Sequence, residues 1–160
     1  MTIELSIIIP TYLREQVLVA TCQSVLAAMD PSHMECWVID DSPTHEPDVE
    51  AWLQRQADLG AIHWVRERTG SLTAARNVAL LRARGEVALY LDDDVLIPPG
   101  LFERHIRWYA DPSVAAVTGE VFNCKNPDQP PPMSDPGRNT FRHVGRDEGD
   151  VRPQYQRGQP

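Results

Sequence analysis

The sequence has no apolar run long enough to cross a membrane, few cysteines and no signal for export. None of its 160 residues lies in a stretch of about 18 or more apolar residues, so we predict no membrane-spanning helix. Three cysteines, an odd number without C-x-x-C spacing, argue against a disulfide framework or a zinc site and suit a reducing compartment. The N-terminus also lacks the basic start and cleavage site of a signal peptide, and we therefore expect a cytoplasmic protein.

Positive charge is also scarce. Lys and Arg number 15 against 23 Asp and Glu, which gives a net charge of −8. Such a chain repels polyanions, so we expect no nucleic acid as a partner. The motifs G-x-G-x-x-G and G-x-x-x-x-G-K-[ST] are absent, which removes the main support for a dinucleotide dehydrogenase or a P-loop enzyme. The five histidines are scattered without metal-ligand spacing.

What is present is an alternation of short apolar runs with amphipathic stretches. The sequence predicts strands at about 4–9, 36–39, 62–65, 87–91 and 114–118, and helices at about 14–29, 49–59, 72–84 and 101–109. This order predicts an α/β fold with a mainly parallel sheet and helices on both faces. Ligands of such sheets bind beyond the carboxyl ends of the strands.

The composition changes near residue 126. Residues 126–160 hold seven of the 14 prolines but only five large apolar residues. So little apolar area cannot offset the conformational entropy lost on folding. We predict a domain over 1–125. Residues 126–160 would be a largely irregular tail, or the truncated start of a second subdomain whose remainder is missing.

Three consecutive carboxylates follow the fourth predicted strand. Asp92, Asp93 and Asp94 repel one another unless a cation or hydrogen-bond donors lie among them. Oxygen ligands select hard divalent ions such as Mg²⁺ or Mn²⁺. The alternative is a solvated acidic turn ahead of Pro98 and Pro99.

Other polar residues follow the remaining strands and open the third helix. Asp41 could accept a hydrogen bond from a base or ribose, or serve only as turn or N-cap chemistry. Tyr12 could stack on a base or simply pack over the strand end. Arg76 could clamp a phosphate or a base edge, or be a plain surface residue. The Gly70-Ser71 pair ahead of that helix indicates an anion site at a helix N-terminus.

These segments together resemble family 2 glycosyltransferases, which have the GT-A nucleotide-diphosphosugar transferase fold. The resemblance covers residues 3 to about 122, and five short segments carry it in the family's order: SIIIPTY (6–12), VIDDS (38–42), GSLTAARN (70–77), ARGE (83–86) and LYLDDD (89–94). Each segment is weak alone, but five in order are specific. One departure is Ser42-Pro43, where the family more often has Gly-Ser.

The resemblance implies roles for the matched positions. Pro10, Thr11 and Tyr12 would line the nucleotide pocket, and Asp41 would accept from the base, usually uracil. Arg76 would lie near the base or the diphosphate. On this view residues 1–125 form the nucleotide-sugar-binding domain, and 126–160 begin the acceptor-binding region.

The acidic triplet would supply the family's D-x-D motif. Asp92 and Asp94 would hold Mn²⁺ or Mg²⁺, with Asp94 the first choice as ligand, while Asp92 and Asp93 would also touch the nucleotide, Asp93 at the ribose. The metal would neutralise the diphosphate as it leaves.

The implied function is the donor-binding half of an inverting, metal-dependent glycosyltransferase that uses a UDP-linked or other nucleotide-diphosphate sugar. Its acceptor would be a sugar, a lipid-linked glycan or another hydroxyl compound, which would allow a position at the inner face of the membrane. Nothing in the residues selects a general base among Asp147, Glu148 and Asp150. The alternatives are a non-catalytic nucleotide-sugar-binding module and, more weakly, a nucleotidyltransferase, which would need a Gly-rich phosphate loop after the first strand.

Overall fold

The computed structural model describes residues 2–119 and 144–145. The predictions for the tail beyond residue 119 lie outside the described residues. So do the third cysteine, Cys124, and the candidate bases Asp147, Glu148 and Asp150. The chain divides into two units between Ile106 and Arg107.

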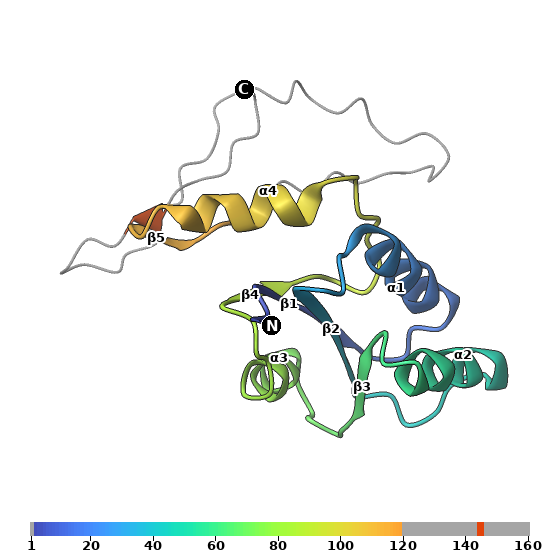
Figure 1. Cartoon of the computed structure of the whole chain (residues 1–160). Helices are drawn as coiled ribbons and strands as arrows, with labels where there is room; N and C mark the ends of the chain where they lie inside the picture. Colours follow the sequence, from blue (N-terminus) through green and yellow to red (C-terminus); the bar gives the residue numbers. More distant parts are fainter. Residues whose placement is uncertain (1, 120–143, 146–160) are drawn as a thin grey trace, which may run out of the picture. The chain divides into compact units, whose positions relative to one another are not determined.

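Strands and helices alternate through the first unit (Figure 1). Its four strands are β1 (Leu5–Thr11), β2 (Met34–Asp40), β3 (His63–Arg66) and β4 (Val87–Tyr90). Its helices are α1 (Gln16–Ala28), α2 (Pro47–Asp58), α3 (Leu72–Leu80) and most of α4 (Leu101–Arg107).

β1 lies in the interior of the sheet, whose strand order is β3-β2-β1-β4 with every pairing parallel. All seven residues of β1 are buried, as its apolar, β-branched sequence favours. β2 pairs with it along the whole length, from Leu5 opposite Met34 to Thr11 opposite Asp40. The predicted parallel sheet is therefore confirmed.

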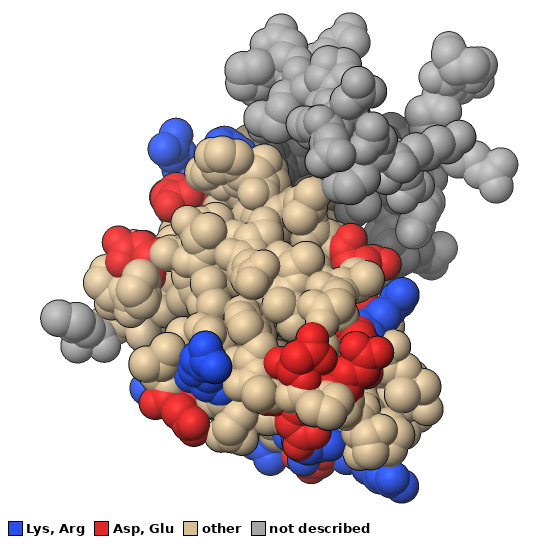
Figure 2. Space-filling model, turned by 90° about the vertical axis from the view of Figure 1, so that its right-hand side faces the viewer, with Lys and Arg blue, Asp and Glu red and all other residues tan. Residues whose placement is uncertain are grey.

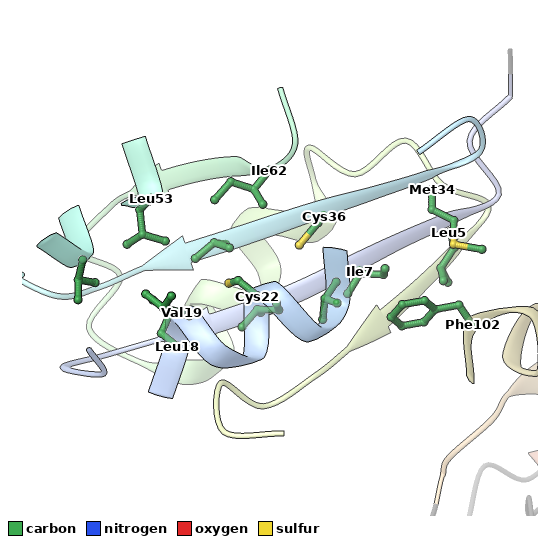
Figure 3. Close-up of a cluster of buried hydrophobic side chains, with 14 residues drawn as sticks. Leu5, Ile7, Leu18, Val19, Cys22, Met34, Cys36, Leu53, Ile62 and Phe102 are labelled. Carbon is green, nitrogen blue, oxygen red and sulfur yellow. The ribbon is translucent and has the colours of Figure 1, made fainter. Parts of the chain in front are cut away.

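Helices cover both faces of this sheet (Figure 1), as predicted. On one face, α1, α2 and Phe102 of α4 pack with alternate strand residues such as Ile7 and Val38 (Figure 3). On the other face, Ala75 and Ala79 of α3 pack against Ile8 and Ile39. Small residues on α3 let this helix lie close to the strands.

Two cysteines lie inside the larger apolar cluster (Figure 3). Cys22 and Cys36 are free thiols. Burial raises the pKa of Cys22 to about 12 and that of Cys36 well above its usual value. Neither thiol forms a thiolate near neutral pH, so both are core residues and not nucleophiles.

The second unit holds a short 3-10 helix, η1 (Trp108–Ala110), and an antiparallel pair of strands, β5 (Val114–Ala116) and β6 (Val144–Gly145). The predicted strand at 114–118 thus ends early. It belongs to a separate two-stranded sheet and not to the parallel one. The amide of Val117, just past β5, donates to the Tyr109 hydroxyl at 3.2 Å.

An ion pair between a buried carboxylate and a largely exposed arginine lies at the amino ends of β1, β2 and β4. Glu35 of β2 accepts from Nε and Nη2 of Arg84 at 2.9 and 2.7 Å, from the Arg84 amide at 2.7 Å and from the Ser6 hydroxyl at 2.7 Å. This contact explains why α3 ends at Leu80 and not at the predicted residue 84, because the chain must turn to bring Arg84 to Glu35.

Gly85 passes directly over β1 at this point. A Cβ atom there would lie 2.5 Å from the Ser6 amide nitrogen, and the Gly85 amide donates to the Ser6 hydroxyl at 2.8 Å. Only glycine fits so close to another backbone. The ARGE segment of the sequence analysis is therefore structural, since Arg84 and Gly85 fasten β4 beside β1.

We predict that Glu35→Gln lowers the free energy of unfolding by about 2 kcal/mol, because Gln cannot accept the bidentate contact from Arg84. The matched control is Glu50→Gln, which breaks the exposed pair with Arg66 and costs less than about 1 kcal/mol. Urea unfolding of both variants measures the difference, and equal losses would contradict this account.

The pair of Glu35 and Arg84 also makes the free energy of unfolding depend on pH. Burial alone would raise the pKa of Glu35, but the hydrogen bonds from Arg84 and Ser6 lower it from 4.5 to about 2. The folded pKa lies below the unfolded one, so the stabilisation is present above pH 4.5 and is lost as the pH falls toward 2. Glu35→Gln should remove that part of the acid transition.

Candidate functional site

The carboxyl ends of the four strands lie at one edge of the sheet. Thr11 ends β1 opposite Asp40 of β2, which in turn pairs with Arg66 of β3, and the triplet follows β4. Because all pairings are parallel, the four polar clusters predicted from the sequence share this edge. We call it the carboxyl edge.

Asp93 is the member of the triplet that points into the protein. Its carboxylate accepts from the Thr11 hydroxyl at 2.7 Å and lies 3.5 Å from Arg14 Nε, while its carbonyl accepts from Thr21 of α1 at 2.9 Å. The side chain is 13% exposed. Burial raises its pKa above the usual value, with Asp94 adding to the shift and Thr11 and Arg14 opposing it.

Asp92 and Asp94 point outward, with side chains 66% and 50% exposed. Nη2 of Arg76 lies 3.7 Å from Asp92, and Nη2 of Arg14 lies 3.6 Å from Asp94. Each outer carboxylate therefore faces an arginine at a distance longer than a hydrogen bond.

No group of three His, Cys, Asp or Glu side chains able to hold a metal ion occurs in the described part of the chain. The donor set still suits a hard divalent ion. Mg²⁺ is usually held by one or two carboxylates with substrate phosphates completing its shell, and Asp92 and Asp94 supply two exposed carboxylates. The residues present thus fit a metal that binds together with a phosphate ligand.

Asp41 holds the loop between β3 and α3. Its Oδ1 accepts from the amides of Thr69 at 2.5 Å and Gly70 at 3.4 Å. Gly70 has a φ of +72°, and Ser71 caps α3 by accepting from the Ala74 amide. The anion site predicted at this helix start therefore faces the chain's own Asp41 carboxylate.

The other predicted residues differ in exposure. Pro10 is buried within β1, whereas Tyr12 is 58% exposed just beyond it. The Arg76 guanidinium lies 5.7 Å from the ring centre of Tyr90. Its Nε is buried and has no hydrogen-bond partner among the described residues, while the side chain as a whole is 37% exposed.

A shallow depression of about 190 Å³ opens at the ends of β2 and β3. Six residues line it: Asp40, Ser42, Pro43, Arg66, Glu67 and Arg68. Arg66 and Arg68 bring positive charge to this depression beside Asp40 and Glu67. On the described part of the face in Figure 2, acidic groups likewise have arginines beside them.

Two residues near the site, Arg14 and His45, were not predicted from the sequence. Arg14 lies only two residues past Tyr12, and its basic charge beside a predicted site was an available signal. His45 was among the scattered histidines, yet its ring is fully buried between Glu15 and Asp40. No spacing rule in the sequence indicates that contact.

The sequence profile described as Glycosyl transferase family 2 matches residues 6–155. The chain belongs to glycosyl transferase family 2. A relative of 28% identity is the uncharacterized protein y4gI of Sinorhizobium fredii, matched over 119 residues that make up 73% of this chain and 13% of that protein.

Solved structures support the GT-A, Rossmann-like fold of this family 2 chain. It superposes on TarS of Staphylococcus aureus with a TM-score of 0.58 and 22% identity, covering 68% of this chain and 20% of TarS. It superposes on the mannosyltransferase PcManGT of Pyrobaculum calidifontis with a TM-score of 0.58 and 24% identity, covering 71% of this chain and 34% of that one. The chain thus spans 20% of TarS and 34% of PcManGT.

We predict that Asp93→Asn stabilises this family 2 chain at pH 7 in the absence of ligands. The folded pKa of Asp93 is raised, so keeping it ionised costs stability at neutral pH, and that cost disappears as the pH falls toward 3.8. Asn keeps an oxygen for the Thr11 hydroxyl. Urea unfolding at pH 7 and pH 4 measures the difference, and a variant less stable at pH 7 would contradict the assignment.

Proposed function

We propose that the chain is the donor-binding half of a glycosyltransferase that moves a sugar from a nucleotide-diphosphate sugar, with UDP as the nucleotide, to an acceptor hydroxyl. Membership of family 2 supports this class. Two structural neighbours add support, one PcManGT in complex with GDP-Man and Mn²⁺ and the other TarS residues 1–349 in complex with UDP-GlcNAc. The acceptor would be a sugar, a lipid-linked glycan or another hydroxyl compound.

The observation that carries the proposal is the convergence of four strand ends at the carboxyl edge. Thr11 contacts Asp93 across 82 residues of sequence, and Asp41 contacts Thr69 across 28. These contacts join the segments that carry Tyr12, Asp41 and Asp93, which supports a nucleotide site at this edge. A solvated acidic turn would not need Thr11 and Arg14 held against Asp93.

The nucleoside would lie between the ends of β1 and β2. Exposed Tyr12 offers a ring face for stacking on the base. Asp41 uses Oδ1 for the Thr69 and Gly70 amides, and its Oδ2 would accept from the base N–H. Asp93, which faces Thr11, would reach the ribose through its remaining acceptor capacity.

The diphosphate would lie over the outer carboxylates. Asp92 and Asp94 would hold Mn²⁺ or Mg²⁺, which when bound neutralises the diphosphate and makes it a better leaving group. Arg76, whose side chain is 37% exposed, would orient a phosphate oxygen through its guanidinium. Inversion requires the acceptor hydroxyl to attack the anomeric carbon from the face opposite the diphosphate.

No helix among the described residues is long and apolar enough to span a bilayer. The site residues named above lie within residues 10–94, and most of the sequence beyond 119 lies outside the described structure. We therefore propose nucleotide-sugar binding by this chain, with transfer completed by an acceptor-binding region.

We predict that UDP binds the purified chain in the presence of Mn²⁺, and that EDTA or Asp94→Ala weakens binding at least about tenfold, because a lost metal ligand typically costs that much. Asp58→Ala is the matched control, since Asp58 is an exposed aspartate at the end of α2 and contacts only Gln54 among the hydrogen bonds described for it. Isothermal titration calorimetry measures the affinities.

Failure of UDP, GDP and dTDP to bind a folded chain would contradict the proposal. UDP binding that is insensitive to both EDTA and Asp94→Ala would contradict the metal site alone. Binding of a UDP-sugar without hydrolysis or transfer would favour the alternative, a non-catalytic nucleotide-sugar-binding module.

A further inference from the structure

His45 lies buried between two carboxylates beneath the carboxyl edge. Its Nε2 is 2.6 Å from Asp40 Oδ2, and its Nδ1 is 3.2 Å from Glu15 Oε2. The side chains of His45 and Asp40 have no exposed surface, whereas Glu15 is 30% exposed. These three residues come from the segments just before α1, at the end of β2 and just before α2. We call them the histidine clamp.

Both ring nitrogens of His45 face acceptors. A carboxylate oxygen only accepts, so the two contacts are both hydrogen bonds only when each nitrogen carries a proton. The charged groups in contact with the ring are Glu15 and Asp40. Nearby, the Trp64 indole donates to the same Asp40 oxygen at 3.0 Å, and Arg66 lies over the Trp64 ring. An imidazolium would make both contacts hydrogen bonds to ionised carboxylates at the same time.

The clamp also holds a strained loop. Leu13 has a φ of +52°, a left-handed conformation that a leucine rarely adopts. Its amide donates to the Ser42 hydroxyl at 2.9 Å, and the Ser42 amide donates to Asp40 Oδ1 at 2.9 Å. Asp40 is therefore linked to the β1–α1 loop by two routes. One runs through Ser42 to the Leu13 amide, and the other runs through His45 to Glu15.

The clamped loops carry the nucleotide-binding residues of the proposed function. Tyr12 precedes the strained Leu13, and Asp41 lies between Asp40 and Ser42. A backbone bond from the Asp41 amide to the Thr11 carbonyl at 3.0 Å joins the same two segments. Strained backbone persists only where surrounding contacts determine it several times over.

We propose that His45 is a positioning residue for the nucleotide site. As a buried imidazolium it ties the loop of Tyr12 to the loop of Asp41, and so fixes the separation of the base-stacking ring and the base-accepting carboxylate. His45 touches neither nucleotide nor metal, and its effect passes through Asp40, Ser42 and Glu15. The expected effect on nucleotide affinity rests on the proposed function, whereas the contacts of His45 do not.

The first test compares UDP affinity in the presence of Mn²⁺ among folded variants of the full chain. Gln cannot contact both carboxylates, so His45→Gln should raise the Kd about tenfold through lost preorganisation. Glu15→Gln, at a partly exposed position, should raise it by a smaller factor and serves if His45→Gln does not fold. Wild-type affinity in whichever of these variants folds would overturn the proposal.

The matched control is His33→Gln. His33 also lies near an aspartate, with Nδ1 3.6 Å from Asp30, but it precedes β2 at the opposite edge of the sheet. Its Kd should stay within about twofold of wild type, because it contacts neither loop. An equal loss of affinity in His33→Gln would show a general effect of stability and would overturn the proposal.

A second test works without nucleotide and so separates this proposal from the proposed function. Nitrogen-15 NMR at pH 7 should show both ring nitrogens of His45 protonated. Amide shifts caused by Glu15→Gln or His45→Gln should extend to residues 12–13 and 41–42. A singly protonated ring, or shifts confined to the substituted residue and its chain neighbours, would overturn the proposal even if UDP binds.

Discussion

The parallel pairing of β1 with both β2 and β4 is the constraint on which the site depends. β1 is buried along its full length and has neighbours on both sides, so the ends of three strands must meet. Polar residues cannot enter such a strand without burial, and they collect where the strands end. A carboxylate that follows β4 therefore meets a hydroxyl at the end of β1.

The carboxylates at the two ends of the parallel strands differ in burial and in how closely arginines pair with them. At the amino ends of the strands, Glu35 is buried and accepts hydrogen bonds from Arg84 and Ser6. At the carboxyl edge, Arg14 and Arg76 lie 3.6 and 3.7 Å from exposed Asp94 and Asp92. Loose pairs of this kind add little to stability. The carboxylates and the arginines of these pairs therefore stay accessible. A ligand that carries a metal and phosphates can contact the carboxylates through the metal and the arginines through the phosphates.

Much of this arrangement could be predicted from the sequence. Alternating apolar and amphipathic stretches predicted the parallel sheet, and the acidic triplet was placed correctly after β4 because strand ends are readable from hydropathy. The contacts of Arg14 with Asp93 and of His45 with Glu15 could not be predicted, since they join segments 79 and 30 residues apart and depend on loop conformation. The strained Leu13 likewise carries no sequence signal, and the role of the ARGE segment emerged only from the packing of Gly85 on Ser6.

The central claim is that one surface, at the carboxyl edge, holds the nucleotide and the metal together. Paramagnetic broadening of amide NMR signals by Mn²⁺ in the presence of UDP tests it most directly. The account predicts that broadening centres on residues 92–94 and spreads to 11–14 and 76, and that it weakens when UDP is omitted. Broadening centred elsewhere, such as on the acidic residues of α2, would contradict it.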